Sequence, residues 1–283
     1  MELIRTAVAF RRALDQARAG GAVVGFVPTM GALHEGHASL IRRARDECGA
    51  VAVSIFVNPL QFGTNEGFGD YPRDEERDLA RAAELGVDVV FAPPVEEMFP
   101  VGEALPTAQP GPVGDRLEGA SRPGHFRGVL TAVARLFDLA GPCRAYFGEK
   151  DAQQLYLVRR MAAGRALPVE VVPCPTVREP DGLARSSRNA LLTPEQREAA
   201  GCLFLALSEA AEAARSGERD AGKLVAVMAR EIGATPVARL DYAAVVDEET
   251  FEEVRRIDGK ARALVAAWFG TIRLIDNLAL PIP

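Results

Sequence analysis

Short apolar runs alternate with segments of helical periodicity over the first 175 residues, and this alternation constrains the fold more than any other feature. Continuous apolar runs of this length are typical of strands buried in a parallel sheet. The expected strands are 22–29, 50–59, 87–94, 143–148 and 169–175. The expected helices between them are 36–49, 71–86, 128–141 and 152–164. Because crossovers between parallel strands are right-handed, the pattern predicts an α/β fold with a Rossmann-like, doubly wound parallel sheet.

The pattern changes after about residue 176, where the strand–helix repeat stops. Long helices over 193–217 and 221–233 are expected there, followed by short strands and turns. The chain is therefore expected to form two domains, a larger one over residues 1–176 and a smaller α+β domain over 177–283. The N-terminal 21 residues read as an amphipathic helix, not as a signal peptide, because charged residues interrupt the apolar ones. The Pro/Gly-rich stretch 93–124 is expected to be a long connection with one or two short elements.

Composition limits the classes of partner. The chain has 283 residues and a formal net charge of -6, which argues against a protein that coats nucleic acid, although a local basic pocket can still bind a small anion. No stretch approaches the roughly 20 apolar residues of a membrane helix. None of the four cysteines forms a C-x-x-C pair, so we expect reduced, buried thiols in a cytoplasmic protein. Only three of the 33 basic residues are lysines, and Lys150 is one of them.

The segment "PTMGALHEGH", residues 28–37, follows the first strand and opens a helix. Backbone N–H groups and the helix dipole favour phosphate at such a position. The usual P-loop and dinucleotide fingerprints are absent, and His34 and His37 stand in their place, sharing one face of the first helical turn. Two alternatives stay open on these residues alone. The histidines can simply cap the loop, or they can bind zinc, which needs further ligands where His125 is the only other histidine.

Three further polar segments also follow predicted strands, so all four are expected to line one cleft at the strand carboxyl ends. In "FGEKDAQQL", Lys150 supplies a positive charge; helix capping is the alternative role for Glu149 and Asp151. In "GLARSSRNALLT", hydroxyl groups and a guanidinium suit phosphate, with a polar interdomain linker as the alternative. In "SIFVNPLQFG", Asn58 and Gln61 follow a strand end.

Five ordered segments together resemble the motif set of the pantothenate synthetase family. They are "PTMGALHEGH", "FVNPLQFG", "RPGHFRGV", "FGEKDAQQL" and "SSRNALLT". The resemblance covers essentially the whole chain. It implies a nucleotidyltransferase fold whose H-x-G-H loop, the HIGH motif, holds ATP. It also implies a homodimeric ligase that uses ATP and Mg²⁺ to condense pantoate with β-alanine through a pantoyl adenylate, with release of AMP and pyrophosphate.

The resemblance also assigns roles to individual positions. It implies that the catalytic residues are His34, His37, Lys150 and Arg188. It implies that further ATP contacts come from Met30, Gly31, Ala32, Leu33, Glu35, Gly36, Gly148, Glu149, Asp151, Val177, Arg185, Ser186 and Ser187. Gln61 would bind pantoate and β-alanine, and Gln154 would bind pantoate, with Asn58 also on the substrate side. No side chain is assigned to a metal, because Mg²⁺ would be carried by the ATP phosphates.

One position departs from the family pattern. Arg185 stands immediately before Ser-Ser-Arg, where the family usually has Met. A backbone contact of residue 185 with ATP would be unaffected, whereas packing of its side chain on the base would change. Two rival functions stay open at this point. One is a related nucleotidyltransferase that keeps the nucleotide in its product, and the other is a nucleotide-binding regulatory module without catalysis.

Overall fold

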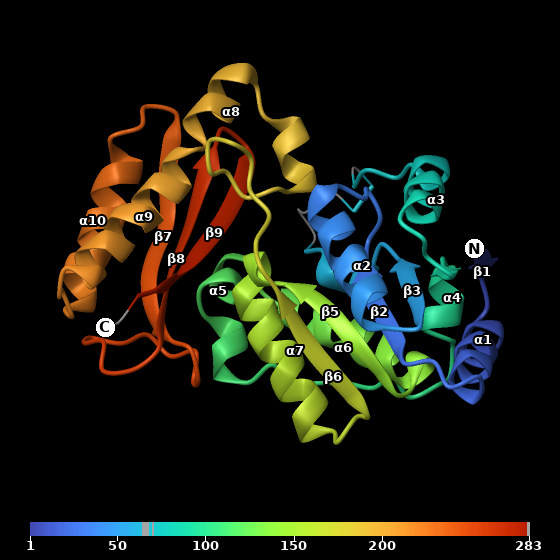
Figure 1. The fold of residues 1–283 in the computed structure, drawn as a ribbon. Helices are drawn as coiled ribbons and strands as arrows, with labels where there is room; N and C mark the ends of the chain where they lie inside the picture. Colours follow the sequence, from blue (N-terminus) through green and yellow to red (C-terminus); the bar gives the residue numbers. More distant parts are fainter. Residues whose placement is uncertain (64–67, 70, 282–283) are drawn as a thin grey trace. The chain divides into compact units, whose positions relative to one another are not determined.

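The computed structural model describes residues 1–63, 68–69 and 71–281, and the chain divides into two compact units (Figure 1). The first unit comprises Met1–Glu149 and Gln153–Pro175, and the second comprises Lys150–Ala152 and Thr176–Pro283. The expected boundary after residue 176 lies one residue from the division at 175/176. Residues 150–152, which were expected in the first domain, group with the second unit instead.

A six-stranded parallel sheet forms the centre of the first unit, as the alternation of apolar runs and helices predicted. Its strands are β1 Glu2–Ile4, β2 Val24–Thr29, β3 Ala50–Ile55, β4 Val89–Phe91, β5 Cys143–Gly148 and β6 Val169–Cys174. They lie in the order β1-β4-β3-β2-β5-β6, and every neighbouring pair is parallel. Because β2 is central, with β3 and β5 beside it, the loops that follow these three strands leave the same edge of the sheet.

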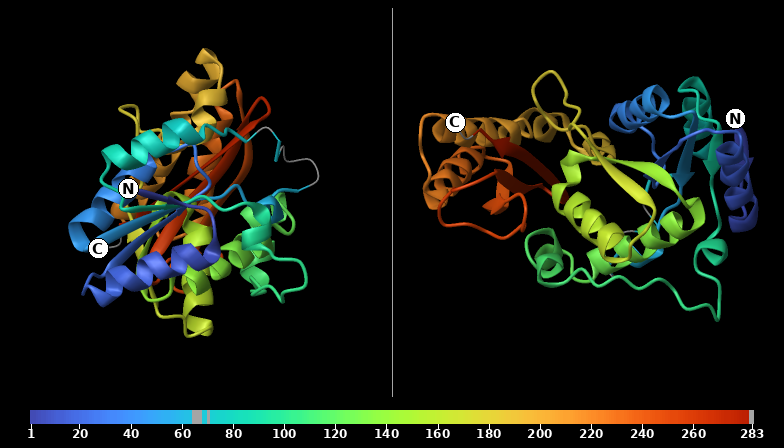
Figure 2. Two further views of the ribbon diagram at one scale, coloured as in Figure 1. Left: turned by 90° about the vertical axis from the view of Figure 1, so that its right-hand side faces the viewer. Right: turned by 60° about the horizontal axis from the view of Figure 1, so that its bottom comes forward.

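Helices cover both faces of this sheet, with α1 on one side and α3 on the other (Figure 2). The helices of the unit are α1 Ala7–Ala19, α2 Glu35–Glu47, α3 Glu75–Glu84, α4 Val95–Met98, α5 Glu118–Ser121, α6 His125–Ala140 and α7 Ala152–Gly164. Fully buried side chains such as Val27, Ile41 and Val53 pack between α2 and the sheet. Burying each aliphatic side chain stabilises the fold by roughly 1.5–3 kcal/mol.

The N-terminal segment differs from the prediction of a single helix. Residues 2–4 pair with β4 as an edge strand, and α1 begins only at Ala7, after Thr6 accepts a hydrogen bond from the Ala9 amide at 3.4 Å. The connection 93–124 contains α4, α5 and the 3₁₀ turn Pro112–Asp115, one short element more than expected.

The second unit is an antiparallel sheet with helices packed on it. Its strands β7 Ala238–Asp247, β8 Ala261–Phe269 and β9 Ile272–Leu280 form a meander in the order β7-β8-β9. The α+β class is therefore confirmed, but these strands have nine or ten residues each and are not short. Helices α9 Cys202–Arg215 and α10 Ala221–Gly233 pack against the sheet around Leu203 and Met228.

The predicted single helix over 193–217 is wrong. The structure breaks it into α8 Pro194–Ala199 and α9, with a turn at Ala200 and Gly201. Glycine lowers helix stability by about 1 kcal/mol relative to alanine, which makes this the weakest point of the segment. Within the described part of the chain, no helix is both long and apolar enough to cross a membrane.

Candidate active site

The loop between β2 and α2 carries the two histidines and has an unusual backbone. The Gly31 amide donates to Thr29 Oγ1 at 3.1 Å, and Gly31 and Ala32 then take φ values of +81° and +50°. Glycine adopts this left-handed region freely, whereas alanine does so at a cost of roughly 1–2 kcal/mol. The chain thereby turns sharply away from the strand and enters α2 at Glu35.

His34 and His37 form a capping box at the start of α2. Nδ1 of His34 accepts a hydrogen bond from the Gly36 amide at 3.1 Å, and Nδ1 of His37 accepts one from the His34 amide at 3.3 Å. The two rings stack with their centroids 4.1 Å apart. A Cβ on residue 36 would lie only 2.8 Å from the His34 ring, so the glycine of the H-x-G-H pattern makes room for the imidazole.

The capping contacts determine the tautomer of both rings. Because each Nδ1 accepts a hydrogen bond, the neutral imidazole carries its proton on Nε2. Each histidine is therefore a hydrogen-bond donor through Nε2 at the N-terminus of a 13-residue helix, where the dipole favours an anion. The capping alternative and the phosphate-binding alternative are compatible, since they use different nitrogens of the same rings.

Several backbone amides of this loop already have acceptors within the protein. The amides of Ala32 and Leu33 donate to the carboxylate of Asp78 on α3, at 2.8 and 2.7 Å. Burial raises the pKa of Asp78, and the two backbone hydrogen bonds partly oppose that rise. The carboxylate of Glu35 also lies within ion pairs, with Arg42 and with Arg81. Phosphate binding by the loop amides themselves stays a prediction, and the side chains are the better candidates.

The residues after β3 form a network that orients Gln61. Asn58 is 2% exposed, and its amide nitrogen donates to Gln61 Oε1 and to the Gly128 carbonyl, both at 3.0 Å. Gln61 Nε2 in turn donates to Met30 Sδ at 3.0 Å. Met30, which the resemblance assigned to ATP, is thus brought together in the first unit with Asn58 and Gln61, which it assigned to the substrates.

The motif "RPGHFRGV" supports this network, although no role was predicted for it. His125 Nδ1 donates to the Gln61 carbonyl at 2.9 Å, while Arg122 lies 2.9 Å from His125 Nε2. A Cβ on Gly128 would lie 2.0 Å from the Leu60 carbonyl, so only glycine lets α6 approach the turn Pro59–Gln61 this closely. The segment could have been identified only by its place among the five motifs, because it follows no strand.

The residues around the end of β5 are divided between the two units. Gly148 and Glu149 are half-buried and belong to the first unit, as does the half-buried Gln154 on α7. Its neighbour Gln153 is 3% exposed and structural, since its side-chain nitrogen donates to the Val113 and Arg116 carbonyls at 2.8 and 2.9 Å.

In the second unit, a hydrogen bond fixes the backbone of Lys150. Its carbonyl accepts a hydrogen bond from the side chain of Asn277 on β9 at 2.8 Å, and its Nζ lies 3.5 Å from Asp151. Next to Asn277, the buried carboxylate of Asp276 forms an ion pair with Arg178 at 2.5 Å. Burial raises the pKa of Asp276, and Arg178 opposes that rise.

The segment with Arg185, Ser186 and Arg188 also belongs to the second unit. Ser186 caps the 3₁₀ turn Ser187–Leu191 by accepting from the Arg188 amide at 3.3 Å. The Arg185 amide donates to the Val177 carbonyl at 2.9 Å, and its guanidinium forms an ion pair with Glu179 at 2.9 Å. The side chain of Arg185 is therefore already partnered by a carboxylate.

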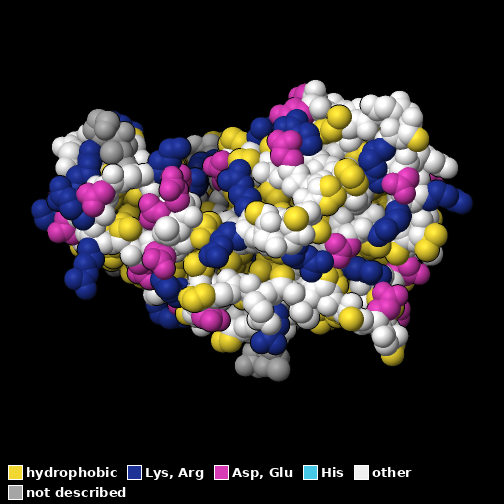
Figure 3. Space-filling view, turned by 90° about the horizontal axis from the view of Figure 1, so that it is seen from below, with side chains coloured by type: hydrophobic (Ala, Val, Ile, Leu, Met, Phe, Trp, Pro, Cys, Tyr) yellow, Lys and Arg dark blue, Asp and Glu magenta, His cyan; other side chains and the backbone are white. Residues whose placement is uncertain are grey.

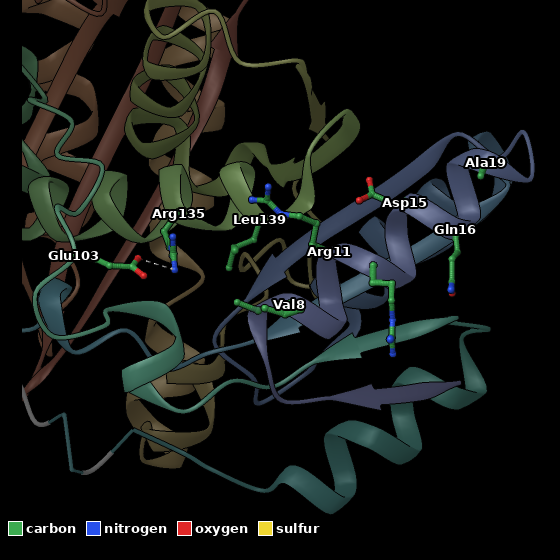
Figure 4. Close-up of a pocket in the computed structure, with 10 residues that line it drawn as sticks. Val8, Arg11, Asp15, Gln16, Ala19, Glu103, Arg135 and Leu139 are labelled. Atoms are coloured by element: carbon green, nitrogen blue, oxygen red, sulfur yellow. Dashed lines mark ion pairs between the residues drawn. The ribbon is translucent and has the colours of Figure 1, made fainter.

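Two other surface features lie apart from these residues. A cavity of about 680 Å³ between α1 and α6 is lined by residues such as Val8, Arg11, Arg135 and Leu139, and by none of the predicted site residues (Figure 4). On the face shown in Figure 3, basic and acidic side chains are interspersed and form no continuous basic surface. Nucleic-acid binding typically requires such a surface. Among the described residues, no group of three or more His, Cys, Asp or Glu side chains is arranged to hold a metal.

Comparisons with known proteins agree over the whole length of the chain. Residues 2–279 match the family model described as pantoate-beta-alanine ligase. The chain belongs to the pantoate–β-alanine ligase family. The pantothenate synthetase of Rubrobacter xylanophilus is 55% identical, with 99% of this chain and 98% of that protein covered. The crystal structure of pantothenate synthetase from Thermus thermophilus is 49% identical with a TM-score of 0.93, and each chain is covered completely.

A third relative was solved with ligands. The pantoate–β-alanine ligase of Francisella tularensis, described as complexed with beta-gamma ATP and β-alanine, is 33% identical with a TM-score of 0.79. The two chains are covered to 99% and 97%. The resemblance and the fold class inferred from the sequence are confirmed by these matches. As a pantoate–β-alanine ligase, the chain is an enzyme that forms a C–N bond.

Proposed function

We propose that this chain condenses pantoate with β-alanine at the expense of ATP, through a pantoyl adenylate. The observation that carries the proposal is the histidine capping box at the N-terminus of α2, in a chain that matches the ligase family over residues 2–279. Because both Nδ1 atoms accept backbone N–H groups, the neutral rings carry their donor protons on Nε2. Such donors suit the negative charge on the phosphates of a nucleotide.

The chemistry requires activation of the acid. A carboxylate is a poor acylating agent because oxide is a poor leaving group. In the first step a pantoate carboxylate oxygen attacks the α-phosphorus of ATP, and the bond to pyrophosphate breaks. In the second step the amine of β-alanine attacks the carbonyl carbon of the adenylate, loses a proton and displaces AMP. Both steps depend on positioning and on stabilisation of charge, and neither needs a nucleophilic side chain.

Each group of residues then has a part in this scheme. His34 and His37 would donate hydrogen bonds to the phosphates, and His37 would donate to the leaving pyrophosphate. Lys150 and Arg188 would neutralise the charge that develops there, with the Ser186 and Ser187 hydroxyls as further donors. The nucleotide contacts would be completed by Gly31, Glu35, Gly36, Gly148, Glu149, Asp151, Val177 and the backbone of Arg185. Ala32 and Leu33 would contribute atoms other than their backbone N–H groups, which already donate to Asp78.

The substrate side of the scheme rests on the amide network after β3. Gln61 would bind the hydroxyl and carboxylate oxygens of pantoate, and its orientation is supported by the hydrogen bonds from Asn58 and to Met30. Gln154 would bind pantoate as well. The same Gln61 side chain would meet β-alanine when the amine attacks.

Three properties follow from the family resemblance alone. We infer that Mg²⁺ accompanies ATP and is held by its phosphates. Bound there, the ion would supply positive charge to the departing pyrophosphate. We also infer a homodimer in the cytoplasm; the four buried, unbridged cysteines fit a reducing compartment.

Isotope exchange tests the two-step scheme directly. The protein should catalyse pantoate-dependent exchange of labelled pyrophosphate into ATP when β-alanine is absent. Exchange that strictly requires β-alanine would exclude a free adenylate. Mass spectrometry of the products from ATP, pantoate and β-alanine separates the rivals: a nucleotidyltransferase would leave AMP attached to its product, and a regulatory module would leave the substrates unchanged.

A further inference from the structure

The carboxylate of Asp78 anchors the loop that leads into α2. Asp78 is 2% exposed on α3, and each of its oxygens accepts one backbone N–H, from Ala32 at 2.8 Å and from Leu33 at 2.7 Å. The start of α3 is capped separately by Asp74, which accepts from the Arg77 amide at 3.1 Å. The role of Asp78 is therefore a tertiary one, directed at residues about 45 positions earlier in the chain.

The loop conformation depends on such an anchor. Ala32 has a φ of +50°, which a residue with a Cβ adopts at a cost of roughly 1–2 kcal/mol. A Cβ on residue 31 would lie 2.7 Å from Asp78 Oδ2, so Gly31 is what allows the carboxylate to approach. Successive backbone N–H groups around a left-handed residue form a concave site for an anion, and here the protein fills that site with its own carboxylate.

We propose that Asp78 is a positioning residue for His34 and His37. By binding the amides of Ala32 and Leu33, it sets the backbone that enters the N-cap of α2, and it withholds these two amides from the phosphates. The nucleotide then meets imidazole N–H donors in place of a loop of backbone amides. The effect on catalysis rests on the proposed function, whereas the state of the two amides does not.

Hydrogen exchange of the unmodified enzyme tests the state of the amides. Residue-resolved exchange should show the Ala32 and Leu33 amides protected before any nucleotide is present, and a non-hydrolysable ATP analogue with Mg²⁺ should leave their protection unchanged. Fast exchange of both amides in the free enzyme would overturn the proposal. New protection of these two amides by the analogue would also overturn it, because they would then be phosphate donors. Neither result depends on turnover.

Substitution tests the positioning role. Asp78→Asn keeps the size of the side chain but replaces one acceptor oxygen by an NH₂ group that faces a backbone N–H. Exchange at Ala32 and Leu33 should become about tenfold faster or more, and kcat should fall by about tenfold or more. In an Ala32→Gly background the same substitution should have a smaller effect, because glycine accepts the positive φ without an anchor.

Asp74→Ala is the matched control on the same helix. It removes the side chain that accepts from the Arg77 amide at the start of α3 and should lower thermal stability, while exchange of the two loop amides and kcat stay at their original values. Equal losses of kcat in both variants would mean that Asp78 only stabilises α3, and the proposal would fall. If Asp78→Asn alone does not fold, the double variant with Ala32→Gly and the exchange of the unmodified enzyme still decide the question.

Discussion

The side-chain amide of Asn277 donates a hydrogen bond to the backbone carbonyl of Lys150 across 2.8 Å. The amide is oriented by Arg262, which donates to Asn277 Oδ1 at 2.6 Å. Lys150 directly follows Glu149 of the first unit in sequence, yet it groups with the second unit. The residue proposed to neutralise the leaving pyrophosphate is thus attached to β9, 127 positions later in the chain.

We expect Asn277→Ala to raise the free energy of activation by more than it lowers the free energy of unfolding. The variant leaves the Lys150 carbonyl without this donor. It thereby removes a restraint on the backbone of the residue that carries the ammonium group. Loss of about tenfold in kcat, or roughly 1.4 kcal/mol of transition-state stabilisation, is expected in pantoate-dependent pyrophosphate exchange. Asp247→Ala is the control in the same unit, because it removes acceptors for the Glu249 and Thr250 amides. Equal loss of exchange activity in both variants would show a general effect on the second unit.

Lys150→Arg should reduce the rate of adenylation by roughly 10²-fold or more, the scale of losing one placed donor. Guanidinium is planar and larger than ammonium, so it does not place its charge at the same point. The Lys150 side chain is only 17% exposed, which leaves little room for the longer group to adjust. Lys260→Arg, at an exposed position, is the matched control and should retain full activity. Near-normal turnover of Lys150→Arg would mean that the charge of Lys150 has no specific role in adenylation.

Much of the fold could be predicted because its signals are local. The strands β2 and β3 are nearly continuous apolar runs, and β5 and β6 are mostly apolar but contain Arg144 and Glu170. Each of the four lies within its expected range. β1 could not be predicted because it has three residues, of which only Ile4 is buried. The break between α8 and α9 was missed because the apolar periodicity continues through Gly201, and periodicity alone does not register the weak helix propensity of one residue.

The candidate site likewise contains residues that the sequence could indicate and residues that it could not. Apart from Val177, the proposed contact residues lie in contiguous motifs, so the sequence resemblance proposes them together. The residues that support them come from distant segments: Asp78 lies 46 positions after Ala32, and His125 lies 64 positions after Gln61. Nothing in the local sequence of α3 distinguishes Asp78 from the other acidic residues of its first turns, since all of them suit the helix dipole. Only the tertiary structure brings these pairs together.

Cys143 should make stability depend on pH in the alkaline range. Burial raises the pKa of its thiol to about 12 from an ordinary value of 9.0. Above pH 9.0 the unfolded chain therefore releases a proton that the native chain still holds, so this contribution to stability is complete below pH 9 and is lost as the pH rises towards 12. Urea unfolding at pH 8 and pH 10 should show a smaller loss of stability for Cys143→Ala than for the unmodified chain. An identical loss in both proteins would mean that the thiol ionises equally in the native and unfolded states.

Arg185→Met should change the KM for ATP by less than about threefold, below roughly 0.7 kcal/mol. The guanidinium of Arg185 is already paired with Glu179 at 2.9 Å, and the backbone amide of the same residue donates to Val177. Its charge is therefore largely balanced within the second unit, and little of it is left for a phosphate. The salt dependence of KM should also stay unchanged, because no contact between opposite charges on enzyme and ATP is lost.

Arg188→Met is the matched comparison, since it removes a guanidinium from the same segment. There the KM for ATP should rise by about tenfold or more, as expected for loss of a charge-assisted contact with phosphate. A tenfold rise for Arg185→Met, steeper at low salt, would place Arg185 in the ATP site. The departure from the family's usual Met would then be a functional change, and the ion pair with Glu179 would have to break when ATP binds.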